Sequence, residues 1–234
     1  MEPSTLLTQS TQKLQELLAK SSSEDLALLI EYNFGQNAGA KTPEELLARI
    51  RYNGSNDITR MLKGGEVADY LAIVRDVAEK TKVSWSEEDP EEIIEKRIFI
   101  QIFERAWKMM SEKEREPIKK LFEEHGSDAE KISKLLIEGT LFDFLPTIGY
   151  LVTWNIARIV AFISAREIGA GALTGFFSEG LGALFIGPIG LILGVGLTAA
   201  FDLAGPAYRK TIPTVLQIAY MRQKANASAS ATTE

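Results

Sequence analysis

Few side chains in this 234-residue sequence have the types and spacing that enzyme chemistry requires. There is no cysteine, which excludes thiol catalysis, disulfides and thiolate metal sites. A Ser-His-Asp triad would depend on His125, the only histidine, and a di-iron bundle would need Glu-x-x-His pairs, whereas Phe122 stands where that glutamate would be. Because Gly126 follows it, His125 is expected at a helix C-terminus, where its charge suits the helix dipole. The sequence therefore predicts a protein without enzyme activity, cofactor or metal.

The distribution of charge along the chain argues against a nucleic-acid partner. The net charge is −6, and residues 1–139 hold 20 Lys or Arg against 27 Asp or Glu, while residues 140–234 hold 6 against 5. Binding to nucleic acid requires a concentrated basic face, so no nucleic-acid partner is expected. No glycine-rich phosphate loop of the G-x-x-x-x-G-K-[ST] type occurs either. The chain thus divides into a charged first part and an apolar, glycine-rich second part.

The first part is predicted to consist of consecutive helices with explicit start signals. Thr42-Pro43-Glu44-Glu45 is typical of a capping box with Pro at the first helical position. Asp89-Pro90-Glu91-Glu92 repeats that arrangement with Asp as the cap, and Ser127-Asp128-Ala129-Glu130 gives a third. Residues 66–81 carry an apolar stripe at helical spacing after the turn at Gly64-Gly65. Since no segment alternates with period two, the fold class is predicted to be all-α.

The second part contains the apolar run EGLGALFIGPIGLILGVGLTAAFD, with 22 uncharged residues between Glu179 and Asp202. A bilayer-crossing helix needs about 20 residues, but Gly187-Pro188 divides the run into two arms that are each too short. The glycines expected to allow close helix packing are Gly180, Gly187, Gly190 and Gly194. The run is therefore predicted to form a tight helical hairpin with Pro188 near its tip.

Three interpretations of this hairpin remain open: a buried core or oligomer-interface element, a fixed transmembrane anchor, and a sheltered hairpin that is used against a membrane or partner. The mean hydropathy of −0.02 and the charged first part favour the third. Arg158 and Arg166 argue against a permanent span between residues 147 and 168, because Arg at the bilayer centre costs about 2.5 kcal/mol or more. The residues expected to contact a membrane or partner are Trp154, Phe176, Phe177, Leu184, Phe185, Ile186, Pro188, Ile189, Leu191 and Ile192.

The expected organisation is a charged α-helical domain over residues 1–139, an apolar hairpin region over 140–205, a helix over 206–224 and a disordered tail over 225–234. Pro213 should kink or interrupt the helix over 206–224. Four cations of that helix, Arg209, Lys210, Arg222 and Lys224, are candidates for contact with anionic lipid head groups, each worth about 1 kcal/mol near a charged surface. The alternative is that Arg209 pairs with an acidic helix of the first part and fixes the two parts together.

Residues 207–219, AYRKTIPTVLQIA, closely resemble the C-terminal signature of the YaaW family of bacterial proteins. The stretch from Gly54 to Asp76-Val77 resembles the second block of that family, and Gly187-Pro188-Ile189-Gly190 is similar to its glycine-rich segment. The signature positions are Gly64, Tyr70, Asp76, Tyr208, Arg209, Thr211, Pro213 and Gln217. The chain departs from the family in having Asn53-Gly54 where two glycines are common, and in a more apolar stretch between residues 150 and 201.

The resemblance implies no catalytic motif, because the family has no agreed one. Some YaaW-type proteins belong to two-component antiphage systems, in which they sense the early lipid-bounded compartment of nucleus-forming jumbo phages and work with an effector. The resemblance therefore implies a cytoplasmic protein, conditionally peripheral to a membrane. Its expected partners are a lipid membrane or phage vesicle, an effector protein and, as a further option, other copies of itself. The alternatives are a soluble protein-interaction or oligomeric module and a pore-forming membrane effector.

Overall fold

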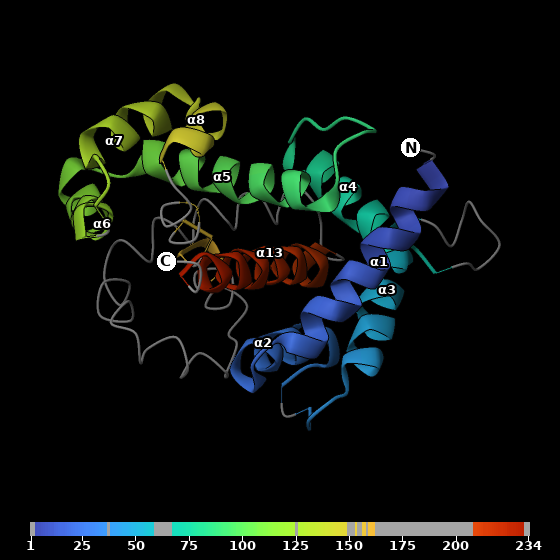
Figure 1. Cartoon of the computed structure of the whole chain (residues 1–234). Coiled ribbons are helices and arrows are strands. Elements are labelled where there is room, and N and C mark those ends of the chain that lie inside the picture. Colours follow the sequence, from blue (N-terminus) through green and yellow to red (C-terminus); the bar gives the residue numbers. More distant parts are fainter. Residues whose placement is uncertain are drawn as a thin grey trace.

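The computed structural model describes residues 3–36, 38–58, 67–124, 126–148, 153, 156–157, 159–161 and 208–231. Over these residues every regular element is a helix, which confirms the predicted all-α class (Figure 1). None of the helices among them is long and apolar enough to cross a membrane. The predicted hairpin over 180–201 lies outside the described residues.

The helices of the described ranges follow one another along the chain with short connections in the first part. Their bounds are α1 Pro3–Lys20, α2 Ser23–Phe34, α3 Pro43–Ile58, α4 Tyr70–Thr81, α5 Glu91–Met109, α6 Glu112–Glu124, α7 Ala129–Glu138, α8 Leu141–Ile148 and α13 Tyr208–Ala231.

The C-terminal helix α13 lies between α5 and α2 and also packs against α3 and α4 (Figure 1). Helix α1 crosses α3 and α4, whereas α7 and α8 pack on α5 with α6 beside α7. Every residue of α13 from Thr211 to Gln223 is buried. The helix at the end of the chain is therefore central to the packing of helices from its beginning.

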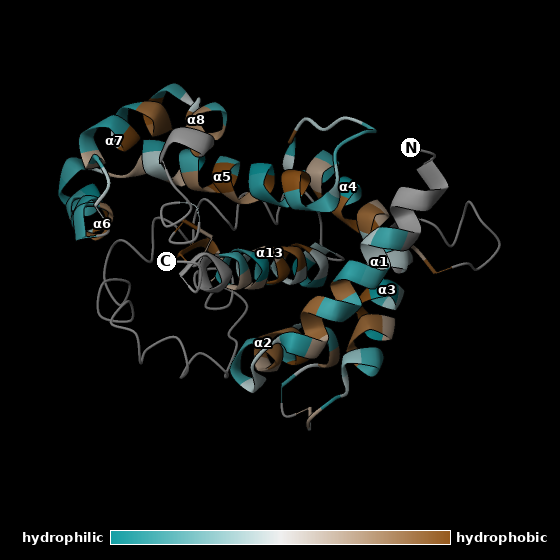
Figure 2. Cartoon of the chain, in the orientation of Figure 1, coloured by the Kyte–Doolittle hydropathy of each residue, from teal (hydrophilic) through white to brown (hydrophobic). Residues whose placement is uncertain are grey.

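Helix α5 has a broad apolar face because several helices pack around it. It is covered by α4 and α13 and by α7 and α8, so apolar residues are needed around much of its circumference (Figure 2). Its largest fully buried side chains are Phe99, Phe103 and Trp107, and the rings of Phe103 and Trp107 pack with centroids 5.8 Å apart. Such aromatic pairs add to stability beyond the area they bury.

One of the three predicted helix starts is confirmed in full. The Glu45 amide donates to Thr42 Oγ1 at 3.2 Å and the Thr42 amide donates to Glu45 Oε2 at 2.9 Å, which is a reciprocal capping box. Asp89 is not the cap of α5, because its carboxylate accepts from the Ser86 amide and the Arg97 guanidinium instead, and Pro90 takes the cap position. The third start is shifted by one residue, since Asp128 caps α7 by accepting from the Lys131 amide at 2.9 Å.

Helix α13 differs from the expectations in two respects. It is continuous from Tyr208 to Ala231 with Pro213 inside it, so of the expected kink or interruption at this proline the interruption does not occur. Pro213 is the sixth residue of the helix, so its missing N–H removes one hydrogen bond near the start. The chain from Ala225 to Ala231 is helical instead of disordered, because Ala is the best helix former and extension of an existing helix is cooperative.

Candidate functional site

The described signature positions lie on α4 and α13, two helices that pack against each other. Tyr70 and Asp76 belong to α4, and the others belong to α13, which packs against it. Tyr70, Asp76, Tyr208, Thr211, Pro213 and Gln217 are buried, whereas Arg209 is exposed. Gly64 lies outside the described residues. Most of the signature therefore belongs to the interior of the helix bundle, and Arg209 is the exception.

Tyr70 is part of a buried charged centre that joins three helices. Its hydroxyl donates to Glu95 Oε1 of α5 at 2.8 Å. Arg222 of α13 donates through Nε to Glu95 Oε2 at 2.9 Å and through Nη2 to Oε1 at 3.2 Å. Glu95 is fully buried and Arg222 is 8% exposed. A carboxylate with this bidentate partner and a third donor has the hydrogen bonds that a buried charge needs.

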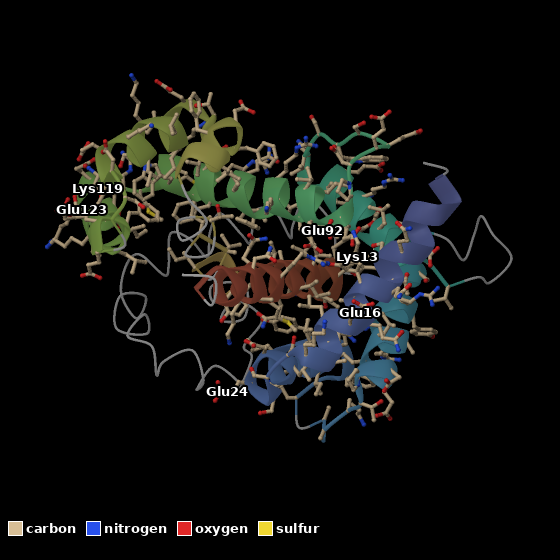
Figure 3. The ribbon with its side chains drawn as sticks, in the orientation of Figure 1. Lys13, Glu16, Glu24, Glu92, Lys119 and Glu123 are labelled. Carbon is tan, nitrogen blue, oxygen red and sulfur yellow. The ribbon has the colours of Figure 1, made fainter. Side chains whose placement is uncertain are left out.

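The centre extends to α1 through the start of α5. Arg222 Nη1 lies 3.8 Å from Glu92 Oε1, and Lys13 Nζ donates to the same oxygen at 3.1 Å. Lys13 Nζ also lies 3.7 Å from Glu91 Oε1. Figure 3 shows Lys13 and Glu92 close together beside α13. Four helices, α1, α4, α5 and α13, thus meet around one group of charges.

The environment shifts the pKa values of three groups in this centre, Glu95, Tyr70 and Arg222. Burial raises the pKa of Glu95, although the charge of Arg222 opposes that shift. Burial also raises the pKa of Tyr70 well above its usual range, and the nearby Glu95 adds to it. For Arg222, burial lowers the pKa, but attraction to Glu95 outweighs this and the pKa is raised. Tyr70 is therefore a neutral donor and not an activated nucleophile, so the centre is suited to holding helices together.

A second set of polar contacts joins α13 to α2. Lys224 Nζ lies 2.9 Å from Asp25 Oδ2, and the Gln217 amide donates to the Asp25 carbonyl at 3.3 Å. Further along α2, Asn33 Nδ2 donates to Thr214 Oγ1 at 3.0 Å. Asn33 Oδ1 accepts in turn from Asn53 of α3 at 2.9 Å. Thr214, Gln217 and Arg222 of α13 therefore have partners on α2 or α5, whereas Thr211 Oγ1 and Gln223 Nε2 are buried without a hydrogen-bond partner among the described residues.

The beginning of α13 differs from its end. Arg209 and Lys210 are exposed, and neither forms an ion pair with a described residue. The ammonium of the exposed Lys80 lies 5.4 Å from the centre of the Tyr208 ring, so a third cation is close by. The ion pair that was the alternative for Arg209 is not formed with a described residue. Arg222 and Lys224, two of the four candidates for lipid contact, form ion pairs instead, because acidic side chains of α5 and α2 lie along the later turns of α13.

The other predicted contact residues cannot be placed in this arrangement. Outside the described residues lie Trp154, Phe176, Phe177, Leu184, Phe185, Ile186, Pro188, Ile189, Leu191 and Ile192, the glycines Gly180, Gly187, Gly190 and Gly194, and His125. Among the residues that are described, no group of three His, Asp or Glu side chains is arranged to hold a metal ion.

The buried charged centre was missed by the sequence analysis, although the sequence contains a signal for it. Glu91 and Glu95 are spaced four apart and continue the stripe of Ile98 and Ile102, so both lie on the apolar face of α5. Arg222 follows an apolar run that ends at Met221. Charges in such positions are rarely buried without a partner, which predicts that they pair with each other.

Comparisons with known proteins agree with the signature. The chain is 29% identical over 209 residues to a UPF0174 protein of Helicobacter pylori (strain J99 / ATCC 700824), covering 88% of this chain and 80% of the relative. It is 29% identical over 219 residues to a UPF0174 protein of another Helicobacter pylori strain (ATCC 700392 / 26695), covering 88% of this chain and 99% of the relative. It is also 29% identical over 185 residues to the UPF0174 protein YaaW of Escherichia coli (strain K12), covering 78% and 72%.

The chain is thus similar over most of its length to proteins named UPF0174, one of which is YaaW. The names of these relatives give a family and no activity, ligand or partner. No family model matches the chain, and no solved structure matches it significantly. In this chain two of the signature positions, Tyr70 and Gln217, form hydrogen bonds that join helices of the bundle.

Proposed function

We propose that this protein is a non-enzymatic sensor of bacterial antiphage immunity that binds a lipid surface, such as an early phage lipid-bounded compartment, and acts with an effector protein. The proposal rests on the uncharged run between Glu179 and Asp202 and on the family resemblance. It describes a cytoplasmic protein that is peripheral to a membrane only when it senses its target.

The observation that supports lipid binding most directly is the position of Arg209 and Lys210. They are exposed, and they follow the end of the uncharged run at Phe201 by eight and nine residues. Cations close to an inserted apolar segment reach the head-group layer, where each contributes about 1 kcal/mol on an anionic surface. Arg222 and Lys224 are held by Glu95 and Asp25, so the proposal assigns the head-group contacts to Arg209 and Lys210 alone.

Co-sedimentation with phospholipid vesicles tests this proposal. The wild-type chain is expected to bind vesicles that contain phosphatidylglycerol, and the double variant Phe185→Asp/Ile189→Asp is expected to lose binding because two charges enter the apolar run. Arg209→Gln/Lys210→Gln should bind up to about 30-fold more weakly, corresponding to two head-group contacts. Lys113→Gln/Lys120→Gln, which removes two exposed cations of α6, is the matched control and should bind like the wild type.

Three outcomes would count against the proposal. Equal vesicle binding by a folded Phe185→Asp/Ile189→Asp protein would remove the role of the apolar run. Absence of vesicle binding by the wild type, combined with unfolding or loss of an oligomer in this variant, would favour an interaction module whose apolar run is core or interface. Release of an entrapped dye by the chain alone would favour a pore-forming effector.

A further inference from the structure

The outer side of α2 forms one wall of a groove of about 590 Å³. Its residues are Ser23, Leu26, Ala27, Ile30 and Glu31 of α2, and Gly35, Gln36, Ala38, Ala40 and Lys41 of the chain that follows. The α2 residues recur at spacings of three and four, so they share one helix face. Leu28, Leu29 and Tyr32 are buried on the opposite face. The groove is therefore separate from the interface between α2 and α13.

The floor of this groove is unusual for the outer face of a helix. An amphipathic helix at the edge of a bundle normally presents polar residues outward, but here Leu26, Ala27 and Ile30 line the groove and remain partly exposed, while Leu26 and Ile30 also pack against the hydrophobic core. The opposite wall consists of small residues, Gly35, Ala38 and Ala40. Concave apolar surfaces of a few hundred cubic ångströms are typical of small-molecule sites.

The size of the groove favours a single extended chain over a helix. Two turns of a helix with its side chains occupy roughly 1,000 Å³, given a diameter of 10–12 Å. The groove holds about 590 Å³, which lies within the range of pockets that bind small ligands. Burying each CH₂ group of an alkyl chain contributes about 0.8 kcal/mol, so even a chain of moderate length would gain substantial affinity.

The charges beside the groove favour a ligand with an anionic head. Lys41 lines the groove, and its ammonium lies 5.2 Å from the centre of the Phe34 ring. The Arg49 guanidinium lies 5.6 Å from the same ring, so two cations flank one aromatic side chain. Glu31 is the one carboxylate among the described lining residues, and its charge opposes an anion. Among the described lining residues the charges of Lys41 and Glu31 balance, and Arg49, which shares the Phe34 ring with Lys41 but is not part of the lining, adds a second cation close to Lys41.

We propose that this groove binds a long-chain fatty carboxylate. The alkyl chain lies on Leu26, Ala27 and Ile30, and the carboxylate lies beside Lys41, with Arg49 as the second nearby cation. Neither Arg209 nor Lys210 is among the described residues that line the groove, so the site does not use the two cations assigned to the proposed lipid-surface binding.

Isothermal titration calorimetry with the full chain tests the site. Decanoate at a submicellar concentration is expected to bind, and hexanoate, which is four CH₂ groups shorter, is expected to bind on the order of 100-fold more weakly. Ala27→Trp fills the groove and should abolish decanoate binding. Lys41→Glu should weaken decanoate about 10-fold and leave 1-decanol unchanged, whereas Glu31→Gln should strengthen decanoate a few-fold, as expected for one nearby charge.

Lys120→Glu is the matched control, because it makes the same charge change on α6, and it should bind decanoate like the wild type. Circular dichroism checks that each variant is folded. The proposal is overturned if the wild type does not bind decanoate, or if folded Lys41→Glu protein binds it as tightly as the Lys120→Glu control. Unaltered vesicle co-sedimentation by the groove variants, and unaltered decanoate binding by Arg209→Gln/Lys210→Gln, separate this site from the proposed membrane contact.

Discussion

The two ends of the signature helix α13 carry the same kinds of side chain in opposite environments. Arg209 and Lys210 near its start are exposed and form no ion pair with a described residue. Arg222 near its end is 8% exposed and pairs with Glu95, and Lys224 pairs with Asp25. The role of a cation in this protein is therefore decided by the helices beside it and not by its residue type.

The difference follows from the acidic residues that surround each end. Arg222 meets Glu92 and Glu95 of α5, and Lys224 meets Asp25 of α2. Buried ion pairs add little net stability compared with apolar residues of similar size, but removing one partner is strongly destabilising. We infer that the end of α13 fixes its register in the bundle, whereas Arg209 and Lys210 near its beginning are exposed.

The largest expected effect is that of Arg222→Met. This change leaves Glu95 buried without its guanidinium, so we expect a loss of about 3–5 kcal/mol in the free energy of unfolding, measured by urea denaturation. The matched variant at the other end of the helix, Arg209→Met, should change stability by less than about 0.5 kcal/mol.

A double variant sharpens this prediction. Glu95→Gln/Arg222→Met removes both charges and keeps an acceptor for the Tyr70 hydroxyl, so it should be more stable than Arg222→Met alone. The single variant Glu95→Gln completes the comparison. If the losses of stability of Glu95→Gln and Arg222→Met add up in the double variant, Glu95 and Arg222 do not act as a pair.

A smaller effect is expected on the pH dependence of stability. Burial raises the pKa of Glu95 above 4.5 in the folded protein. A carboxyl group with a raised folded-state pKa contributes stability below its unfolded pKa, and loses that contribution as the pH rises through the folded value. Without Arg222 the pKa of Glu95 rises further, so the deficit of Arg222→Met relative to the wild type should be smaller near about pH 4 than near about pH 7.5. A deficit of the same size at both pH values would mean that the lost guanidinium acts through packing.

Local signals in the sequence predicted the local structure of the chain. The capping box at Thr42 was confirmed because both of its partners lie within one turn of the helix. Asp89 had the same local pattern, but Arg97 and the Ser86 amide compete for its carboxylate. The helical class and the family signature were likewise accessible, since both depend on residues close together in sequence.

Pairing between distant residues was not predictable in the same way. Arg222 and Glu95 are 127 residues apart, and Asn33 and Thr214 are 181 apart, so no spacing rule connects them. The apolar neighbours of Glu95 and Arg222 showed that each charge would be buried, but not which partner each would meet. The expected lipid role of Arg222 failed for this reason, whereas the exposed position of Arg209 leaves its lipid role open to test.

The smallest expected effect on stability concerns Arg209→Gln/Lys210→Gln. Both side chains are exposed, so the free energy of unfolding should stay within about 0.5 kcal/mol of the wild type, as measured by urea denaturation. The contribution of Arg209 and Lys210 to the binding of phosphatidylglycerol vesicles should also weaken when salt is added. Salt screens exposed charges, over about 10 Å at 0.1 M ionic strength. A loss of stability comparable to that of Arg222→Met would contradict the comparison of the two ends, because it would require Arg209 or Lys210 to hold α13 in the bundle. If Arg209→Gln/Lys210→Gln keeps its stability but binds vesicles more weakly, and the lost binding is the salt-sensitive part, the two ends of α13 differ in function as well as in burial.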